Sequence, residues 1–267
     1  MALVPFPGPQ SGAYQPDLED DEDDGAAGKM SFLEHLDELR KRIVASCLGV
    51  AIGILVSFAF INQTVNFLLT PTWKVLPAGS RMIYTQPGEA FGLYVQIGLI
   101  VGVIFATPWI MYQVWLFIAP GLYANEKKLA IPFVLMSTAG FIGGAAFNHY
   151  IIFPFMITFF ASFNTPDLVF MPRLEDVFDL YTKMLLGMGL VFQMPTVVFF
   201  LAKMRMVTAR FLLRHTKYAV LIIFIVAAVI TPSGDMITQT IFAAPMLGLY
   251  ALSILIAWIF APKREIS

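Results

Sequence analysis

The stretch SFLEHLDELRKR, residues 31–42, lies between an acidic amino-terminal segment and the first long apolar run. Ser31 and Glu34 have the three-residue spacing of a capping box, which predicts that a helix begins here. Apolar residues then recur every three or four positions, at Phe32, Leu36, Leu39 and Ile43. Charged residues occupy the other faces. This pattern predicts an amphipathic helix.

The charged faces of this helix contain two acid-before-base pairs four residues apart, Asp37 with Lys41 and Glu38 with Arg42. Each such pair stabilises an exposed helix by about 0.3 kcal/mol. Glu34 and Glu38 have the same spacing and repel each other by a similar amount. Two interpretations stay open. The two acids serve a cationic partner, or the stretch is simply a capped lead-in to a membrane helix.

The composition indicates an integral membrane protein. Of the 267 residues, 58% are hydrophobic and only 13% are charged, which is too apolar for a soluble domain. The single cysteine, Cys47, lies in an apolar run, which excludes an internal disulfide and a thiolate metal cluster. Phosphate-binding glycine loops and the common hydrolase and metal motifs are absent from the sequence, so we expect neither an enzyme nor a cofactor.

The amino-terminal segment has its own composition. Residues 1–28 contain seven acidic and no basic side chains, whereas the remainder of the chain has 17 basic and 11 acidic ones. The segment lacks the basic start and apolar core of a secretory signal, and it is too polar to bury a core. We therefore expect a disordered cytoplasmic tail over residues 1–29, a six-helix membrane domain over 30–262, and a short cytoplasmic carboxyl terminus over 263–267.

Six apolar segments suggest an all-α fold with six transmembrane helices, at residues 43–61, 92–117, 129–148, 180–202, 218–231 and 237–260. A helix needs about 20 residues to cross ~30 Å of hydrocarbon. The fifth segment has only 14 residues before Pro232 and Gly234. Either it extends into flanking residues, or the bilayer is thin there.

The distribution of Lys and Arg predicts the orientation of these helices. With a cytoplasmic amino terminus, 13 basic residues fall on the inside and four on the outside, namely Lys74, Arg81, Arg173 and Lys183. Because basic residues concentrate in cytoplasmic loops, and the number of spans is even, both termini are expected inside. No internal repeat is visible, which disfavours an inverted-repeat transporter.

The two larger outside loops contain apolar residues that a simple linker would not need. Residues 62–91 include three prolines and several apolar side chains, and we expect them to pack as a cap over the helices. Residues 150–163 form an apolar run too short to span the membrane. We expect this run to form a separate helix at the outer interface, after a break near Pro154.

The predicted spans contain almost no ionisable residues, but they contain glutamines. Apart from Lys183 near one end of the fourth span, no Asp, Glu, Lys, Arg or His lies within them, which disfavours a proton- or ion-coupled transporter. An amide facing lipid would lose its hydrogen bonds, so each glutamine should face a helix, a cavity or a headgroup. The four are Gln96, Gln113, Gln193 and Gln239.

Gln193 is the glutamine for which we expect a functional role. It lies in the middle of the fourth span, in the sequence Phe192-Gln193-Met194-Pro195. Pro195 removes one backbone donor, and the resulting kink should leave polar groups available at that depth. The other interpretation is that each glutamine only connects neighbouring helices.

Four separated motifs resemble the TatC family, the central subunit of the twin-arginine protein translocase. They are SFLEHLDELRKRI, YQVWLFIAPGLYANEKK, FQMPTVVFFL and TPSGDMITQTIFAAPM, in the family's order. The resemblance covers about residues 30–262. It implies six helices in a cupped-hand arrangement in the cell inner membrane, with both termini cytoplasmic. It also implies an oligomeric complex with TatA-type and TatB-type single-span subunits, which exports folded proteins with the proton-motive force and binds no nucleic acid.

The resemblance further implies roles for individual residues. Glu38 and Glu126 match the two acids that contact the paired arginines of signal peptides, and paired guanidinium groups do favour fixed carboxylates. Alone, Glu126 would be an ordinary solvated loop acid. Other residues match family positions with signal-docking, structural or partner-helix roles, namely Arg40, Phe117, Pro71, Asp235, Gln113 and Gln239. Relatives often have glutamate where this chain has Gln193, so a role that needs an ionisable group does not transfer.

A second hypothesis comes from another class of protein. A small-molecule permease or channel would place its substrate site at the level of Gln193. Neighbouring genes for single-span proteins with amphipathic helices, and exported precursors with Arg-Arg before an apolar core, would favour the translocase over the permease.

Overall fold

The structure, a computed structural model, describes residues 32–76, 82–118, 130–165, 167, 169–231 and 235–260. The expected acidic tail, Ser31 of the capping box, and residues 263–267 lie outside this range. Helices make up nearly all of the described chain. Those of the first half are α1 (Phe32–Ala59), α2 (Ile61–Val75), α3 (Glu89–Ile118), α4 (Ala130–Phe147), the π-helix η3 (Asn148–Ile152) and α5 (Phe153–Ala161). Those of the second half are α6 (Leu174–Val191), α7 (Met194–Lys203), α8 (Ala209–Arg214), α9 (Thr216–Ile230) and α10 (Met236–Phe260).

Each of the six predicted apolar segments corresponds to one or two helices in the described part of the chain. Five helical runs are long and apolar enough to cross a membrane, namely Leu33–Ala59, Glu89–Ile118, Ala130–Ala161, Leu174–Lys203 and Met236–Phe260. The remaining helix, α9, corresponds to the fifth predicted segment and has 15 residues. At 1.5 Å per residue it is about 22 Å long, which is shorter than the ~30 Å hydrocarbon layer. The prediction of a short fifth segment is confirmed.

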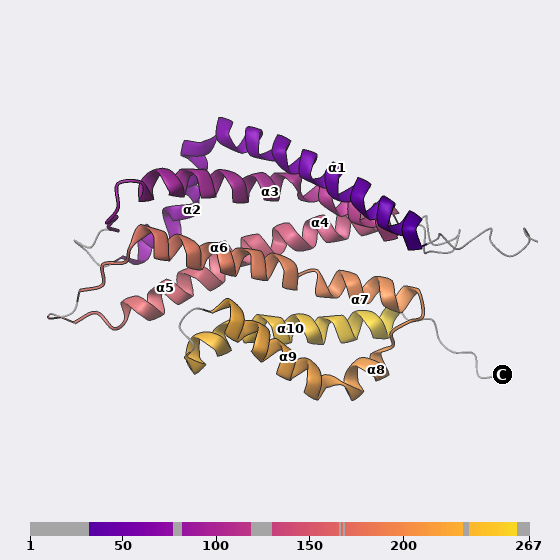
Figure 1. The fold of residues 1–267 in the computed structure, drawn as a ribbon. Coiled ribbons are helices and arrows are strands. Elements are labelled where there is room, and N and C mark those ends of the chain that lie inside the picture. Colours follow the sequence, from indigo (N-terminus) through magenta and orange to yellow (C-terminus); the bar gives the residue numbers. More distant parts are fainter. Residues whose placement is uncertain are drawn as a thin grey trace, which may run out of the picture.

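The long helices lie side by side, and their ends gather at two opposite ends of the molecule (Figure 1). We call the proximal end the one where α1 begins, α3 ends, α4 begins, and α7 and α10 end. We call the distal end the one that holds α2, α5 and the beginnings of α3 and α6. Within this arrangement α1 packs along α3, α4 packs against both α3 and α6, and α10 packs against α7 and α9.

Glycines allow the helices to approach each other closely. A Cβ atom added at Gly53 of α1 would lie 2.3 Å from the backbone oxygen of Gly102 in α3. A Cβ atom added at Gly144 of α4 would lie 2.6 Å from the backbone oxygen of Met188 in α6. Without a strong hydrophobic drive between helices in lipid, such small residues permit the close packing that holds them together.

The most deeply buried residues belong to α6. Its inward face is formed by large side chains that are almost fully buried, namely Phe178, Tyr181, Met184, Leu185 and Met188. By contrast, most apolar side chains of α1 are exposed in the isolated chain, as expected for a helix that faces lipid on one side. The helix α6 is therefore the centre of the bundle and α1 lies at its edge.

The amphipathic start of α1 is present, but its apolar face does not pack into the core. Leu36 is 44% exposed and Ile43 is 53% exposed, whereas Glu38 and Arg42 on the polar face are partly buried. In a membrane, apolar side chains are stable when they face lipid, whereas polar side chains need partners within the protein. The polar face of α1 therefore turns towards the neighbouring helix.

The expected break near Pro154 is wrong. The chain forms one helical run from Ala130 to Ala161, and the π-helix η3 lies immediately before α5. Pro154 lies in the first turn of α5. Proline has no backbone N–H to donate. Because a π turn shifts the hydrogen-bonding pattern by one residue, the chain stays helical through this position. As a result His149, just beyond the predicted end of the span, lies within the helical run.

The prediction that the first outside loop packs over the helices is confirmed for its helical part. The helix α2 contacts α3, α5 and η3, and it buries one face made of Val65, Leu68, Leu69, Pro71 and Thr72. The distal end of the bundle is thereby covered by an amphipathic helix.

Candidate functional site

A cluster of three polar side chains joins α1 to α3 at the proximal end. Arg42 donates from Nε to Oε1 of Glu38 at 2.7 Å, and its Nη2 contacts the same oxygen. Its Nη1 also lies 3.4 Å from Oε1 of Gln113. The Glu38 side chain is 16% exposed and that of Arg42 is 30% exposed, while Gln113 is buried. We call these three residues the proximal cluster.

The sequence accounts for this geometry in two steps. Glu38 and Arg42 are four residues apart, so they lie on the same face of α1 and form the predicted pair. The close approach of α1 and α3 then brings Gln113 beneath the guanidinium group. The link from Arg42 to Gln113 was not predicted, because a contact between residues 71 positions apart has no signal in a single sequence.

Other candidate residues surround the proximal cluster. Phe117, one turn further along α3, stacks on His35 of α1 with 4.5 Å between ring centroids. Arg40 is exposed on α1, and Lys41 forms its predicted ion pair with Asp37 at 2.8 Å on the surface. Glu126 lies outside the described residues, in the segment that connects the proximal ends of α3 and α4.

The chemistry of the proximal cluster favours a guanidinium group. Glu38 already binds one from its own chain, in a partly buried position where charge-assisted hydrogen bonds are strong. The stacked rings of His35 and Phe117 add an aromatic surface nearby, on which a further guanidinium can also stack. The arrangement is thus suited to binding an arginine-containing segment, and it contains no nucleophile–base pair of the kind used in covalent catalysis.

Gln193 lies elsewhere, in the interruption between α6 and α7. The α-helix is interrupted there at Phe192 and Gln193, and Pro195 lies in the first turn of α7. The side-chain amide donates from Nε2 to the backbone oxygen of Ser137 in α4 at 2.8 Å. The amide therefore connects two helices.

Three cavities among the described residues have linings that do not include Gln193. One of them, of about 510 Å³, is an apolar groove between α1 and α3 next to Trp109. These three cavities give the permease hypothesis no support.

The remaining candidate residues have contacts within their own regions. Pro71 is buried in α2. Asp235 precedes α10 and accepts a hydrogen bond from the backbone N–H of Thr238 at 2.8 Å, as a helix cap does. Gln239 donates from Nε2 to the backbone oxygen of Phe224 in α9 at 2.7 Å. The structure brings none of these three to the proximal cluster.

Some polar residues were not singled out from the sequence. His35 is one of them, and its signal was only an aromatic ring one turn before Glu38. His149 and Tyr181 are others: they are buried and joined by a 3.0 Å contact between Nδ1 and the phenol oxygen. Glu89, at the beginning of α3, is a fourth.

The long apolar helices and the buried polar contacts between them define a multi-pass α-helical membrane protein. The sequence model of the family described as "Sec-independent protein translocase protein (TatC)" matches residues 34–245. The chain therefore belongs to the TatC family, whose members are components of a protein translocase and not enzymes.

Individual relatives and solved structures agree with this assignment. The TatC protein of Koribacter versatilis is 40% identical over 241 residues, which cover 88% of each chain. That of Desulforapulum autotrophicum is 39% identical over 237 residues, covering 89% of this chain and 87% of the relative. A crystal structure described as the twin arginine translocase receptor TatC has a TM-score of 0.74 at 33% identity, covering 84% of this chain and 97% of that one. A second, in DDM, has a TM-score of 0.76 at 34% identity, with coverages of 84% and 99%.

Proposed function

We propose that this protein is the receptor subunit of a twin-arginine translocase, and that its proximal end binds the signal peptides of folded precursor proteins. Glu38 and Glu126 contact the two arginines, and Arg40 and Phe117 contribute to the same surface. Gln193 contacts a more deeply inserted part of the peptide. The family assignment supports this role for the chain as a whole.

The observation that carries the proposal is the engagement of Glu38 with a guanidinium group. Its carboxylate is partly buried, held at the junction of α1 and α3, and bound to Arg42 of the same chain. An arginine of a signal peptide would bind in the same way, by displacing Arg42 or by using the second carboxylate oxygen. A carboxylate accepts hydrogen bonds at both oxygens, so either route is chemically available.

The wider part of the proposal is supported by membership of the TatC family. The subunit acts in an oligomeric complex with TatA-type and TatB-type single-span proteins, surrounded by membrane lipid, and the complex uses the proton-motive force. In this proposal Pro71, Gln113, Asp235 and Gln239 maintain the fold or contact the partner helices. The internal hydrogen bond of Gln239 to α9 favours the first of these roles for that residue.

The same proposal places the proximal end in the cytoplasm of a cell whose inner membrane holds the protein. The described basic residues support this orientation. Arg40, Lys41, Arg42, Lys203, Arg205, Arg210, Arg214 and Lys217 belong to segments at the proximal end, and Lys74, Arg173 and Lys183 belong to segments at the distal end (Figure 1). Cytoplasmic sides of membrane proteins carry the excess of Lys and Arg.

Equilibrium binding of a labelled twin-arginine signal peptide to the purified protein tests the proposal. We expect Glu38→Gln and Glu126→Gln each to weaken binding about ten- to a hundred-fold, because each removes a charge-assisted contact of ~1.5 to 3 kcal/mol. Glu38→Asp should be only partly tolerated, since its carboxylate is one methylene shorter. Asp37→Asn is the matched control, because that exposed acid pairs only with Lys41 in the described structure. Unchanged binding by both glutamate variants would contradict the assignment.

A further inference from the structure

Two loops run side by side at the distal end, although they are about 90 residues apart in the sequence. One precedes α3 and the other precedes α6. Ile83 donates its backbone N–H to the oxygen of Pro172 at 3.2 Å, and Leu174 donates to the oxygen of Ile83 at 2.9 Å. These bonds place the first turn of α6 next to the first turn of α3.

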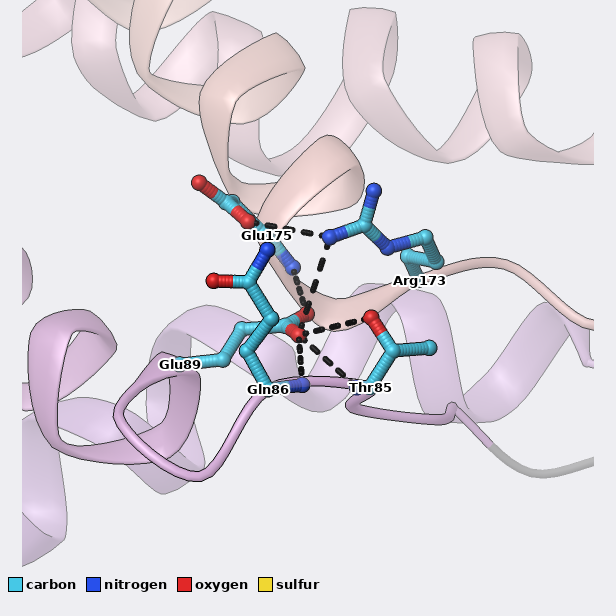
Figure 2. Close-up of polar contacts among 5 residues, drawn as sticks. All are labelled: Thr85, Gln86, Glu89, Arg173 and Glu175. Carbon is cyan, nitrogen blue, oxygen red and sulfur yellow. Dashed lines mark hydrogen bonds and ion pairs between the residues drawn. The ribbon is translucent and has the colours of Figure 1, made fainter.

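The carboxylate of Glu89 lies between these two loops (Figure 2). Its Oε2 accepts from the backbone N–H of Thr85 at 2.9 Å and of Gln86 at 3.3 Å, both in its own loop. Its Oε1 accepts from the backbone N–H of Glu175 at 3.2 Å, in the first turn of α6. Arg173 lies 3.7 Å from Oε2. The Glu89 side chain is only 2% exposed.

This arrangement supplies a helix cap from another helix. The first N–H groups of an α-helix have no partner within the helix and favour a negative charge nearby. The residue in the N-cap position of α6, Arg173, makes no side-chain capping hydrogen bond. Glu89 of α3 takes this place, because it accepts directly from an amide in the first turn of α6.

Hydrogen bonds to backbone amides, more than the ion pair, define the role of Glu89. All three amide contacts are shorter than the 3.7 Å to Arg173, and Arg173 is closer to Glu175, at 3.1 Å. A simple ion pair would need only opposite charges. The observed contacts need an acceptor with two oxygens, one that reaches the loop before α3 and one that reaches the first turn of α6.

We propose that Glu89 is a positioning residue that clamps the beginning of α6 to the beginning of α3. The helix α3 ends at the proximal cluster, and α6 ends at Gln193. The clamp therefore fixes the spacing of the two helices that carry these regions. The clamp lies at the distal end, away from the proximal surface that is proposed to bind the signal peptide.

Hydrogen–deuterium exchange of the purified protein tests the clamp at the amides it holds. In Glu89→Gln the side-chain NH₂ group faces backbone donors, so amides in the first turn of α6 should exchange about tenfold faster. The matched control is Glu175→Gln, which removes a partner of Arg173 but keeps the capped backbone N–H. Equal exchange in Glu89→Gln and the unmodified protein, or equal acceleration in both variants, would overturn the proposal.

Removing the arginine separates a cap from an ion pair. Arg173→Met removes the cation but keeps both Glu89 oxygens on the backbone amides, so exchange in the first turn of α6 should stay slow. Fast exchange in Arg173→Met, equal to that in Glu89→Gln, would show an ion pair only and overturn the cap. If Glu89→Gln fails to accumulate in membranes, Glu89→Asp replaces it, because its shorter carboxylate keeps the charge but cannot reach both loops, and fast exchange is again expected.

The spacing of the two helices gives an independent readout. Spin labels at Phe91→Cys in α3 and Lys183→Cys in α6, in a Cys47→Ser background, report the distance between exposed positions near the clamp. We expect a narrow distance distribution with Glu89 and with Glu175→Gln, and a clearly broader one with Glu89→Gln. The same narrow distribution in all three proteins would overturn the role of Glu89 in helix spacing.

Discussion

At the scale of single residues, the polar side chains between helices differ in whether their hydrogen-bonding partner can be exchanged for another. Glu38 binds the guanidinium group of Arg42 of its own chain, and in the proposed function an arginine of a signal peptide takes that place. Gln193 instead donates to one fixed backbone oxygen. The first arrangement suits exchangeable binding, and the second suits the positioning of a helix interruption.

Gln193 gives a prediction in which transport and folding are separable. Gln193→Leu removes the donor to Ser137 and the polar group at mid-span, at a cost of ~1 kcal/mol, so we expect impaired export with nearly normal membrane levels. Gln193→Glu should remain active, since a protonated carboxyl group can still donate a hydrogen bond to the backbone oxygen of Ser137. Export of a folded twin-arginine reporter, measured beside membrane levels, provides the readout. Full export by the Leu variant would reduce Gln193 to packing, and failure to accumulate would make it purely structural.

A second prediction concerns pH. Glutamine does not titrate, so export by this protein should show no pH dependence that is attributable to position 193. The pH profile of reporter export should therefore be shared by the unmodified protein and Gln193→Asn. A change in its midpoint between these two proteins would contradict the prediction.

At the scale of the elements, close contacts between glycines decide how α1 and α3 pack. Gly53→Ala would place a methyl group 2.3 Å from a backbone oxygen that cannot move easily, so we expect a loss of about 1 to 3 kcal/mol. Gly248→Ala in α10 is the control, because no atom lies within 4 Å of the added Cβ. That change should be neutral or stabilising by up to ~1 kcal/mol.

Thermal unfolding in detergent compares these two variants. The midpoint should fall for Gly53→Ala and hold or rise for Gly248→Ala. If both midpoints moved equally, the close approach of α1 to α3 would not be a determinant of stability.

The elements also show what a single sequence can and cannot predict. Apolar length predicted all six segments, and the four-residue spacing predicted the pair of Glu38 with Arg42. The continuous run through Pro154 was not predicted, because a π turn depends on packing against neighbouring helices and has no simple sequence pattern. Contacts such as Arg42 with Gln113, or Glu89 with α6, depend on tertiary packing, so the sequence offered only the acid or the amide itself.

At the scale of the whole molecule, the two ends of the bundle have different proposed roles. The distal end is covered by α2 and held by Glu89, and the proximal end carries the proximal cluster.

The amino-terminal tail is expected to contribute to neither end of the bundle. Deletion of residues 1–28 should leave membrane insertion and reporter export intact, because the basic residues that set orientation remain. Normal insertion with lost export would contradict this expectation.

The location at which the signal peptide binds tests the proposed receptor role of the proximal end. A signal peptide with a photoreactive group next to its two arginines would be crosslinked to the protein in native membranes, and the sites identified by mass spectrometry. We expect adducts at the proximal end, around His35, Glu38 and Phe117, that disappear when both peptide arginines are replaced by glutamine. Adducts mainly at the distal end, around Tyr84 and Glu89, or adducts that persist without the arginines, would contradict it.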